Sequence, residues 1–138
     1  MIREVVKDVE FLSQPCERYD NSKHSGLIQD LLDTANAHID RCVGLACNQI
    51  GERVKLIVVK NGDKFMAMKN PMIIKRSGGT FVAKERCLSL EGERSVNRYR
   101  QITVMYEDIN SKQKRLQCNG FIAQIIQHEC DHLKGILI

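Results

Sequence analysis

The sequence contains no tryptophan, and aromatic residues make up only 5% of its 138 residues. Apolar residues still reach 43%, which is enough for one core built mostly from aliphatic side chains and methionine. No stretch approaches the roughly 18 consecutive apolar residues of a membrane-spanning helix, and the N-terminal segment lacks the apolar stretch of a signal peptide. We therefore expect a single domain over residues 1–138, in a cytoplasmic protein with no membrane partner.

Long runs of like charge are also absent. The formal net charge is +4, with Lys and Arg spread along the chain. This distribution argues against a specific nucleic-acid partner and leaves room only for a transient contact with an acidic surface such as the ribosome. Since no export signal is present, we expect the cysteines to be reduced thiols and not disulfides. They are Cys16, Cys42, Cys47, Cys87, Cys118 and Cys130.

Hydrophobic periodicity predicts helices towards both ends of the chain and strands between them. Apolar residues recur at helical spacing over residues 25–40. Residues 54–59 and 64–68 are typical strands joined by a tight Asn61-Gly62 turn. Further strands are predicted at 71–75, ending at Gly78-Gly79, and at 102–108 and 114–118. We expect an α+β fold with antiparallel strands in more than one small sheet.

The last predicted helix begins near Asn119, a good N-cap residue, and stops at Gly135. His128 and His132 lie on one line of this helix, on the face that we expect to be buried. Buried imidazoles need partners. The same line carries Phe121 and Ile125, and the opposite face carries Gln124, Gln127 and Lys134. We therefore expect the antiparallel sheets to pack around a C-terminal metal-binding helix, with the N-terminal helix beside them.

Residues 128–132 read His-Glu-Cys-Asp-His, an H-E-x-x-H motif. On a helix, His128 and His132 can reach one ion while Glu129 lies beside it without ligating. The alternative of two core histidines and a surface glutamate is disfavoured by the complete motif. A catalytic zinc-type site has three protein ligands and an open position. Because only six residues follow the motif, the third ligand must come from upstream, from an acidic residue, His24, His38 or a cysteine.

Two further motifs accompany this one. Residues 85–89 read Glu-Arg-Cys-Leu-Ser, and residues 42–49 read Cys-Val-Gly-Leu-Ala-Cys-Asn-Gln. In order and separation, the three motifs resemble those of the peptide deformylases, and the resemblance covers the chain from about residue 40 onward. It implies a metal-dependent hydrolase that removes the N-formyl group from the N-terminal formyl-methionine of newly made polypeptides and releases formate. Its partners would be N-formylmethionyl nascent peptides.

The resemblance implies that Cys87, as a thiolate, is the third metal ligand beside His128 and His132. This ligand set leaves a fourth position for water, whose pKa the ion lowers towards neutrality. The family typically uses Fe(II) in the cell and also accepts Zn, Ni or Co, and the donor set does not select among these ions. Glu129 would take a proton from the water and pass it to the departing amine.

Other residues acquire roles from the same resemblance. The side-chain amide of Gln49 and the main-chain N–H of Leu88 would stabilise the oxyanion that forms on the formyl group. Gly44 would let the chain approach the substrate closely. Arg94 would have a structural or peptide-contacting role. Asp131 is a candidate anchor behind the ligands, with a solvated helix position as the alternative.

The chain also departs from the family pattern. Arg86 replaces a glycine that lies along the bound peptide in the family, so we expect it to narrow the cleft or to favour acidic peptides. Cys42 and Cys47 replace a glycine and an alanine. These departures leave an alternative open, namely a deformylase-like protein that binds metal and peptide but has little catalytic activity. The H-E-x-x-H motif alone would also fit a zinc endopeptidase.

Overall fold

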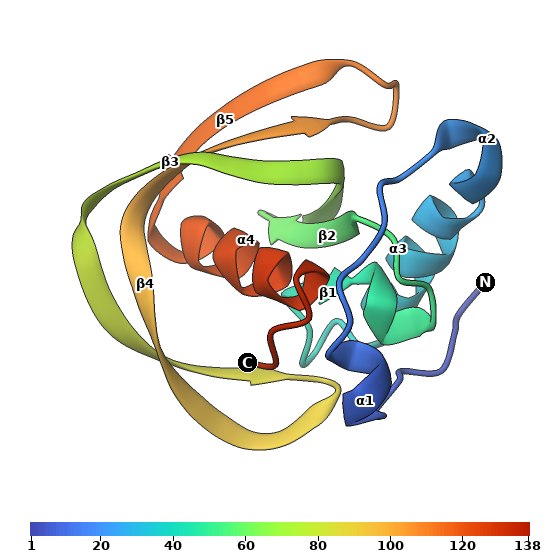
Figure 1. Ribbon diagram of the computed structural model, residues 1–138, viewed down its shortest axis with the longest axis horizontal. Coiled ribbons are helices and arrows are strands. Elements are labelled where there is room, and N and C mark those ends of the chain that lie inside the picture. The colour runs from blue at the N-terminus through green and yellow to red at the C-terminus, as the bar shows by residue number, and fades with distance from the viewer.

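One continuous antiparallel sheet curves around the last helix in the computed structural model, which describes residues 1–138 (Figure 1). The strands are β1 (Gly44–Ala46), β2 (Leu56–Asn61), β3 (Lys64–Cys87), β4 (Leu90–Glu107) and β5 (Gln113–Asn119). Each strand pairs with the next one along the chain. The α+β class is thus confirmed, but a single sheet takes the place of the several small ones that the sequence suggested.

The length and curvature of β3 and β4 explain why one sheet suffices. Their pairing is interrupted by register shifts at four places, one of them between Ser77 and Thr80. Such bulges bend a strand and increase its twist. Gly78 and Gly79 lie in this interruption with φ of 75° and 74°, a conformation that glycine adopts without steric penalty. The prediction that a strand ends at these glycines was wrong, because they bend β3 and the strand continues.

The helices are short, apart from two. They are α1 (Val9–Leu12), α2 (Asn21–His24), α3 (Leu27–Ala37), the 3-10 helix η1 (Cys47–Ile50) and α4 (Gly120–Leu133). The helix predicted over residues 25–40 corresponds to α3, which buries Leu27, Leu31 and Ala35. None of the helices has the length and apolar character needed to cross a membrane.

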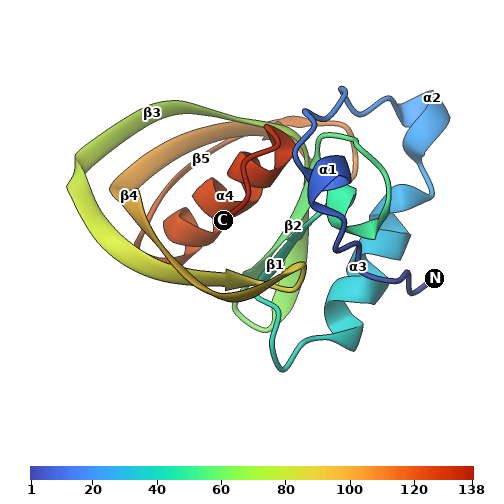
Figure 2. The same ribbon diagram turned by 60° about the horizontal axis from the view of Figure 1, so that its bottom comes forward.

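The two long helices cover opposite faces of β1 and β2 (Figure 2). Ile57 and Val59 belong to the core cluster that contains the buried residues of α4. Leu56 and Val58 belong to the cluster that contains those of α3. Because side chains alternate along a strand, the continuous apolar run in β2 supplies both clusters. Strand β2 is therefore packed between α4 on one face and α3 on the other.

Helix α4 follows its predicted limits. Asn119 is the N-cap residue, although its side chain makes no capping hydrogen bond. Gly135 has a φ of 80°, and its N–H donates to the carbonyl of His132 at 3.0 Å. His128 and His132 are buried, as the sequence predicted.

Two positions of α4 differ from the prediction. Phe121 is 59% exposed although it shares a line with the histidines, and Gln127 is buried on the face that we expected to be polar and open. The Gln127 amide bonds to both the N–H and the carbonyl of Tyr99 in β4, each at 2.9 Å. Since the sheet curves around α4, strand β4 covers part of the helix that would be free beside a flat sheet.

Candidate metal centre

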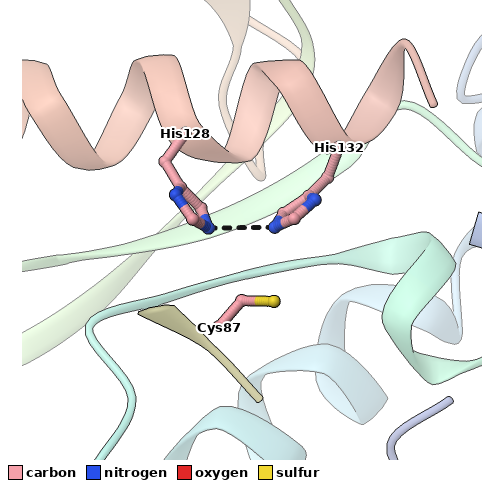
Figure 3. Close-up of side chains that lie close together, drawn as sticks. All are labelled: Cys87, His128 and His132. Atoms are coloured by element: carbon pink, nitrogen blue, oxygen red, sulfur yellow. Dashed lines mark hydrogen bonds between the residues drawn. The ribbon is translucent and has the colours of Figure 1, made fainter. Parts of the chain in front are cut away.

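Three potential metal ligands converge between the end of β3 and the C-terminal half of α4. The ligand atoms of Cys87, His128 and His132 all lie within 4.8 Å of one another. The two Nε2 atoms of the histidines are 2.9 Å apart, and Figure 3 shows them facing each other across one turn of α4, with the Cys87 side chain beside them. The structure thus brings together the three residues that the sequence nominated as ligands.

The donor atoms fit a divalent ion. The Nδ1–H of His128 donates to Glu85 Oε1 at 2.7 Å, which directs the Nε2 atom of this ring towards His132. The rings meet edge to face, with their centroids 4.6 Å apart. Two imidazole nitrogens and a thiolate are a donor set that Zn and Fe(II) accept, and three ligands leave a further position open.

The two histidines differ in pKa in the metal-free protein. Burial lowers the pKa of His132 to about 3, and the charge of His128 adds to this effect. Burial also acts to lower the pKa of His128, but hydrogen bonds with Cys87 and Glu85 outweigh it and raise the pKa to about 10. One ring is therefore protonated at neutral pH, and a bound ion would displace that proton because metal ligands must be deprotonated.

Glu85, Arg98 and Asp131 form a buried chain of ion pairs, and Glu85 contacts the Nδ1 side of the His128 ring. Arg98 in β4 donates from Nη2 and Nε to the two oxygens of Glu85 at 2.7 and 3.0 Å, and from Nη1 to Asp131 at 2.6 Å. Burial would raise the pKa of Glu85, but the bonds from His128 and Arg98 overcome this effect and lower the pKa to about 2. Asp131 is thus anchored, and Glu85 is a permanent carboxylate that orients the His128 ring.

Sequence reasoning gave no role to Glu85 and missed Arg98. Glu85 was visible within the Glu-Arg-Cys-Leu-Ser motif, two residues before Cys87. Arg98 carried no comparable signal, since its partners are 13 and 33 residues away along the chain. The signal appears only in the strand register, in which β4 runs antiparallel beside β3.

Glu129 is a buried carboxyl group beside the histidines, and its Oε1 has no hydrogen-bond partner. Burial raises its pKa to about 7, so that it can hold and release a proton near neutral pH. The main chain of Gly44 lies against it. A Cβ atom at Gly44 would be 2.8 Å from Glu129 Oε2 and 2.7 Å from Ile125 Cγ2. The close approach of β1 to α4 therefore requires glycine at this position.

Gln49 and Leu88 supply polar hydrogens near the end of β3. The Gln49 side chain accepts from the Ala46 N–H and donates to Ser89 Oγ, both at 3.0 Å, which fixes the amide and leaves its second hydrogen free. The N–H of Leu88, in the turn between β3 and β4, makes no hydrogen bond within the protein. Both groups can therefore donate to a ligand without breaking an existing bond.

A cavity of about 230 Å³, here called the site cavity, opens beside these groups. Among the predicted residues it is lined by Gly44, Arg86, Cys87, Leu88, His128 and Glu129, whereas Gln49, Arg94 and His132 do not line it. The Arg94 guanidinium donates to the carbonyl of Glu91 at 3.0 Å, and its Nε and Nη2 are buried without a partner. The cavity also has apolar walls to which the sequence assigned no binding role, namely Val43, Phe121 and Ile125.

Known proteins resemble this chain over nearly its whole length. The sequence model of the polypeptide deformylase family matches residues 2–138. The peptide deformylase of Clostridium beijerinckii is 44% identical over 138 residues, which cover both chains completely. The crystal structure of a peptide deformylase from Legionella pneumophila superposes with a TM-score of 0.88 at 31% identity, covering 99% of this chain and 83% of that one. A Met-Ala-Ser-bound peptide deformylase from Acinetobacter baumannii gives 0.87 at 25% identity, covering 99% and 96%.

Proposed function

This chain belongs to the peptide deformylase family and removes the N-formyl group from new polypeptides, and we propose that Cys87, His128 and His132 hold the metal ion for that reaction. The observation that carries the proposal is the convergence of the three ligand atoms within 4.8 Å. Membership of the family disfavours both alternatives, a binding protein with little activity and a zinc endopeptidase.

Peptide deformylases are metalloenzymes, and we assign Fe(II) to this chain in the cell, with Zn, Ni or Co as substitutes. The bound ion supplies Lewis acidity, which polarises the formyl carbonyl and lowers the pKa of a water molecule. The mixed sulfur and nitrogen donors suit each of these metals. Glu85 contributes by holding the Nδ1–H of His128, which keeps the Nε2 atom of that ring aimed at the ion.

Glu129 moves the proton. It takes a proton from the attacking water and delivers it to the amine nitrogen as the C–N bond of the formamide breaks. Its buried position and the absence of a partner for Oε1 suit this exchange. As the formyl oxygen gains negative charge, it accepts hydrogen bonds from the free amide hydrogen of Gln49 and the N–H of Leu88.

The site cavity receives the N-terminal methionine of the substrate. Val43, Phe121 and Ile125 offer apolar contacts to its side chain, and Gly44 and Arg86 border the path of the peptide main chain. Arg94 supports the β3–β4 turn through its bond to the carbonyl of Glu91. That a relative binds Met-Ala-Ser in its crystal structure agrees with a peptide of this kind.

The setting of the reaction follows from its substrate. Formylated nascent chains are made in the cytoplasm of bacteria, so we place the protein there, as one domain over residues 1–138 in transient contact with the ribosome. We expect no specific nucleic-acid partner, because lysine and arginine are spread along the sequence without a long run.

Formate release tests the proposal. The protein is purified anaerobically with Fe(II), its metal content is measured, and formyl-Met-Ala-Ser is supplied as substrate. We expect formate at enzymatic rates from the parent and at least about 100-fold less from Glu129→Ala, because a positioned proton carrier contributes that much. Absence of formate from fully metal-loaded protein would overturn the assignment. Cleavage of internal bonds in an unformylated protein would favour the endopeptidase.

A further inference from the structure

Exposed cations surround the mouth of the site. The site cavity is bounded by Arg41, Lys84 and Arg86. A second hollow of about 540 Å³ also borders residues 87–88, and it is lined by Lys7 together with the same Arg41 and Arg86. The two spaces share the β3–β4 turn and these two arginines. A chain that passes from one space to the other must therefore run beside Arg41 and Arg86.

Few carboxylates offset these charges. Glu85 and Glu129 line the site cavity but are buried, at 6% and 4% exposure, and face inward. Glu91 is the one exposed carboxylate along the two spaces.

The cations themselves are nearly free of partners. Lys7, Arg41 and Lys84 form no ion pair. Arg86 meets Glu93 at 3.5 Å, with side chains that are 74% and 46% exposed, and a pair so exposed contributes little. A peptide that extends out of the site cavity therefore meets an excess of positive charge.

Resting on the proposed function, we propose that this protein prefers formyl-methionyl polypeptides whose next residues are aspartate or glutamate. With the methionine in the site cavity, the following residues cross the turn at 87–88 and extend into the second hollow. Their side chains then come within range of Arg41, Arg86 and, further along, Lys7. Acidic side chains are attracted there and basic ones are repelled.

The expected size of the effect follows from Coulomb's law. A partly exposed pair of charges several ångströms apart changes binding by about fivefold, and two acidic residues in place of two basic ones by about tenfold or more. The effect must depend on salt, because the Debye length falls from about 10 Å at 0.1 M to about 3 Å at 1 M ionic strength.

Three peptides test the inference: formyl-Met-Ala-Ser, formyl-Met-Asp-Asp and formyl-Met-Lys-Lys. At low salt we expect kcat/KM for the acidic peptide to exceed that for the basic one by about tenfold, and the ratio to approach one at high salt. Arg86→Glu should remove or invert the preference. The matched control is Arg115→Glu, which changes net charge equally at an exposed β5 position outside both spaces and should keep the parent ratio.

A binding measurement separates recognition from turnover. The same peptides are titrated calorimetrically into the Glu129→Ala variant, in which we expect tighter binding of the acidic peptide, and weaker discrimination when Arg86→Glu is added. If metal-loaded protein releases no formate from formyl-Met-Ala-Ser, the proposed function itself fails. If that peptide is hydrolysed but the acidic and basic peptides are processed equally, or if Arg86→Glu leaves their ratio unchanged, only the inferred preference is overturned.

Discussion

Among single residues, Glu85 has the most connections to the site. It accepts hydrogen bonds from His128 and Arg98 while almost fully buried. Glu85→Gln keeps the volume but removes the charge. We expect metal affinity to fall about 10–100-fold, because second-sphere partners of metal-bound histidines have effects of this size. Stability should fall by about 3–5 kcal/mol, because Arg98 loses a buried counter-ion.

Chelator competition measures the affinity in this experiment, and urea unfolding measures the stability. The control is Glu93→Gln, whose carboxylate pairs only at the surface and whose loss should change stability by less than about 0.5 kcal/mol. An unaltered metal affinity in Glu85→Gln would mean that this carboxylate does not orient His128.

Two thiols near α4 allow the ligand assignment to be tested by comparison. Cys87 contributes to the three-ligand cluster, whereas Cys130 is buried in the apolar core on the same helix. Cys87→Ser should sharply reduce the metal retained per chain after gel filtration, because it replaces a thiolate by a hydroxyl that remains protonated. Cys130→Ser should retain metal like the parent even if it lowers stability. Equal losses in the two variants would show that the wrong thiol was chosen.

Between elements, β1 approaches α4 closely at Gly44. Gly44→Ala would place a methyl group 2.7 Å from Ile125 Cγ2 and 2.8 Å from Glu129 Oε2. We expect a loss of about 1–3 kcal/mol, as for overpacked cores, together with reduced formate release because Glu129 must shift. Gly26→Ala is the control, since its φ is −73° and no atom lies within 4 Å of the new methyl. Equal urea midpoints for the two variants would contradict this account.

The elements also show what the sequence could predict. Local patterns located α4, its two histidines and the hairpin between β2 and β3, because helical periodicity and turn chemistry are encoded in neighbouring residues. The turn itself was predicted one residue too early, since Asn61 pairs with Lys64 and the two turn residues are Gly62 and Asp63. The same patterns placed a strand end at Gly78-Gly79, since a glycine pair that bends a strand resembles one that ends it. The structure distinguishes the two cases, because β3 pairs with β4 both before and after the two glycines.

The residues of the site also fall into two groups, those that local motifs predict and those that only the structure reveals. Cys87, His128, His132 and Glu129 were found from motifs, and the structure brings them together. Arg98 and the burial of Gln127 depend on how the sheet curves around α4, which no local pattern encodes. For the same reason, no local sequence pattern predicts that the cations Lys7, Arg41 and Arg86 line one space.

For the whole molecule, an ion held by the proposed ligands would link the end of β3 to α4. Binding to the folded state alone should stabilise it by about 2.7 kcal/mol at a free metal concentration 100 times the dissociation constant. For a chain of this size that corresponds to a rise in Tm of about 5–10 °C. Thermal unfolding with and without Ni or Zn measures the shift, which a chelator should reverse and Cys87→Ser should lack. An identical Tm for loaded and metal-free protein would mean that the ion does not bridge the two elements.

Helix α4 follows every strand in the chain, yet it lies in the middle of the fold, enclosed by β3, β4 and β5 (Figure 1). During synthesis, the strands therefore emerge with nothing to close around, and their apolar inner face stays open until residues 120–133 have left the ribosome. Two of the three proposed ligands, His128 and His132, arrive with that helix, so we expect the growing chain to bind a metal ion only late. A chain interrupted before α4 would therefore lack two of the three proposed ligands and the apolar cluster around that helix, whereas the cluster around α3 contains no residue of α4.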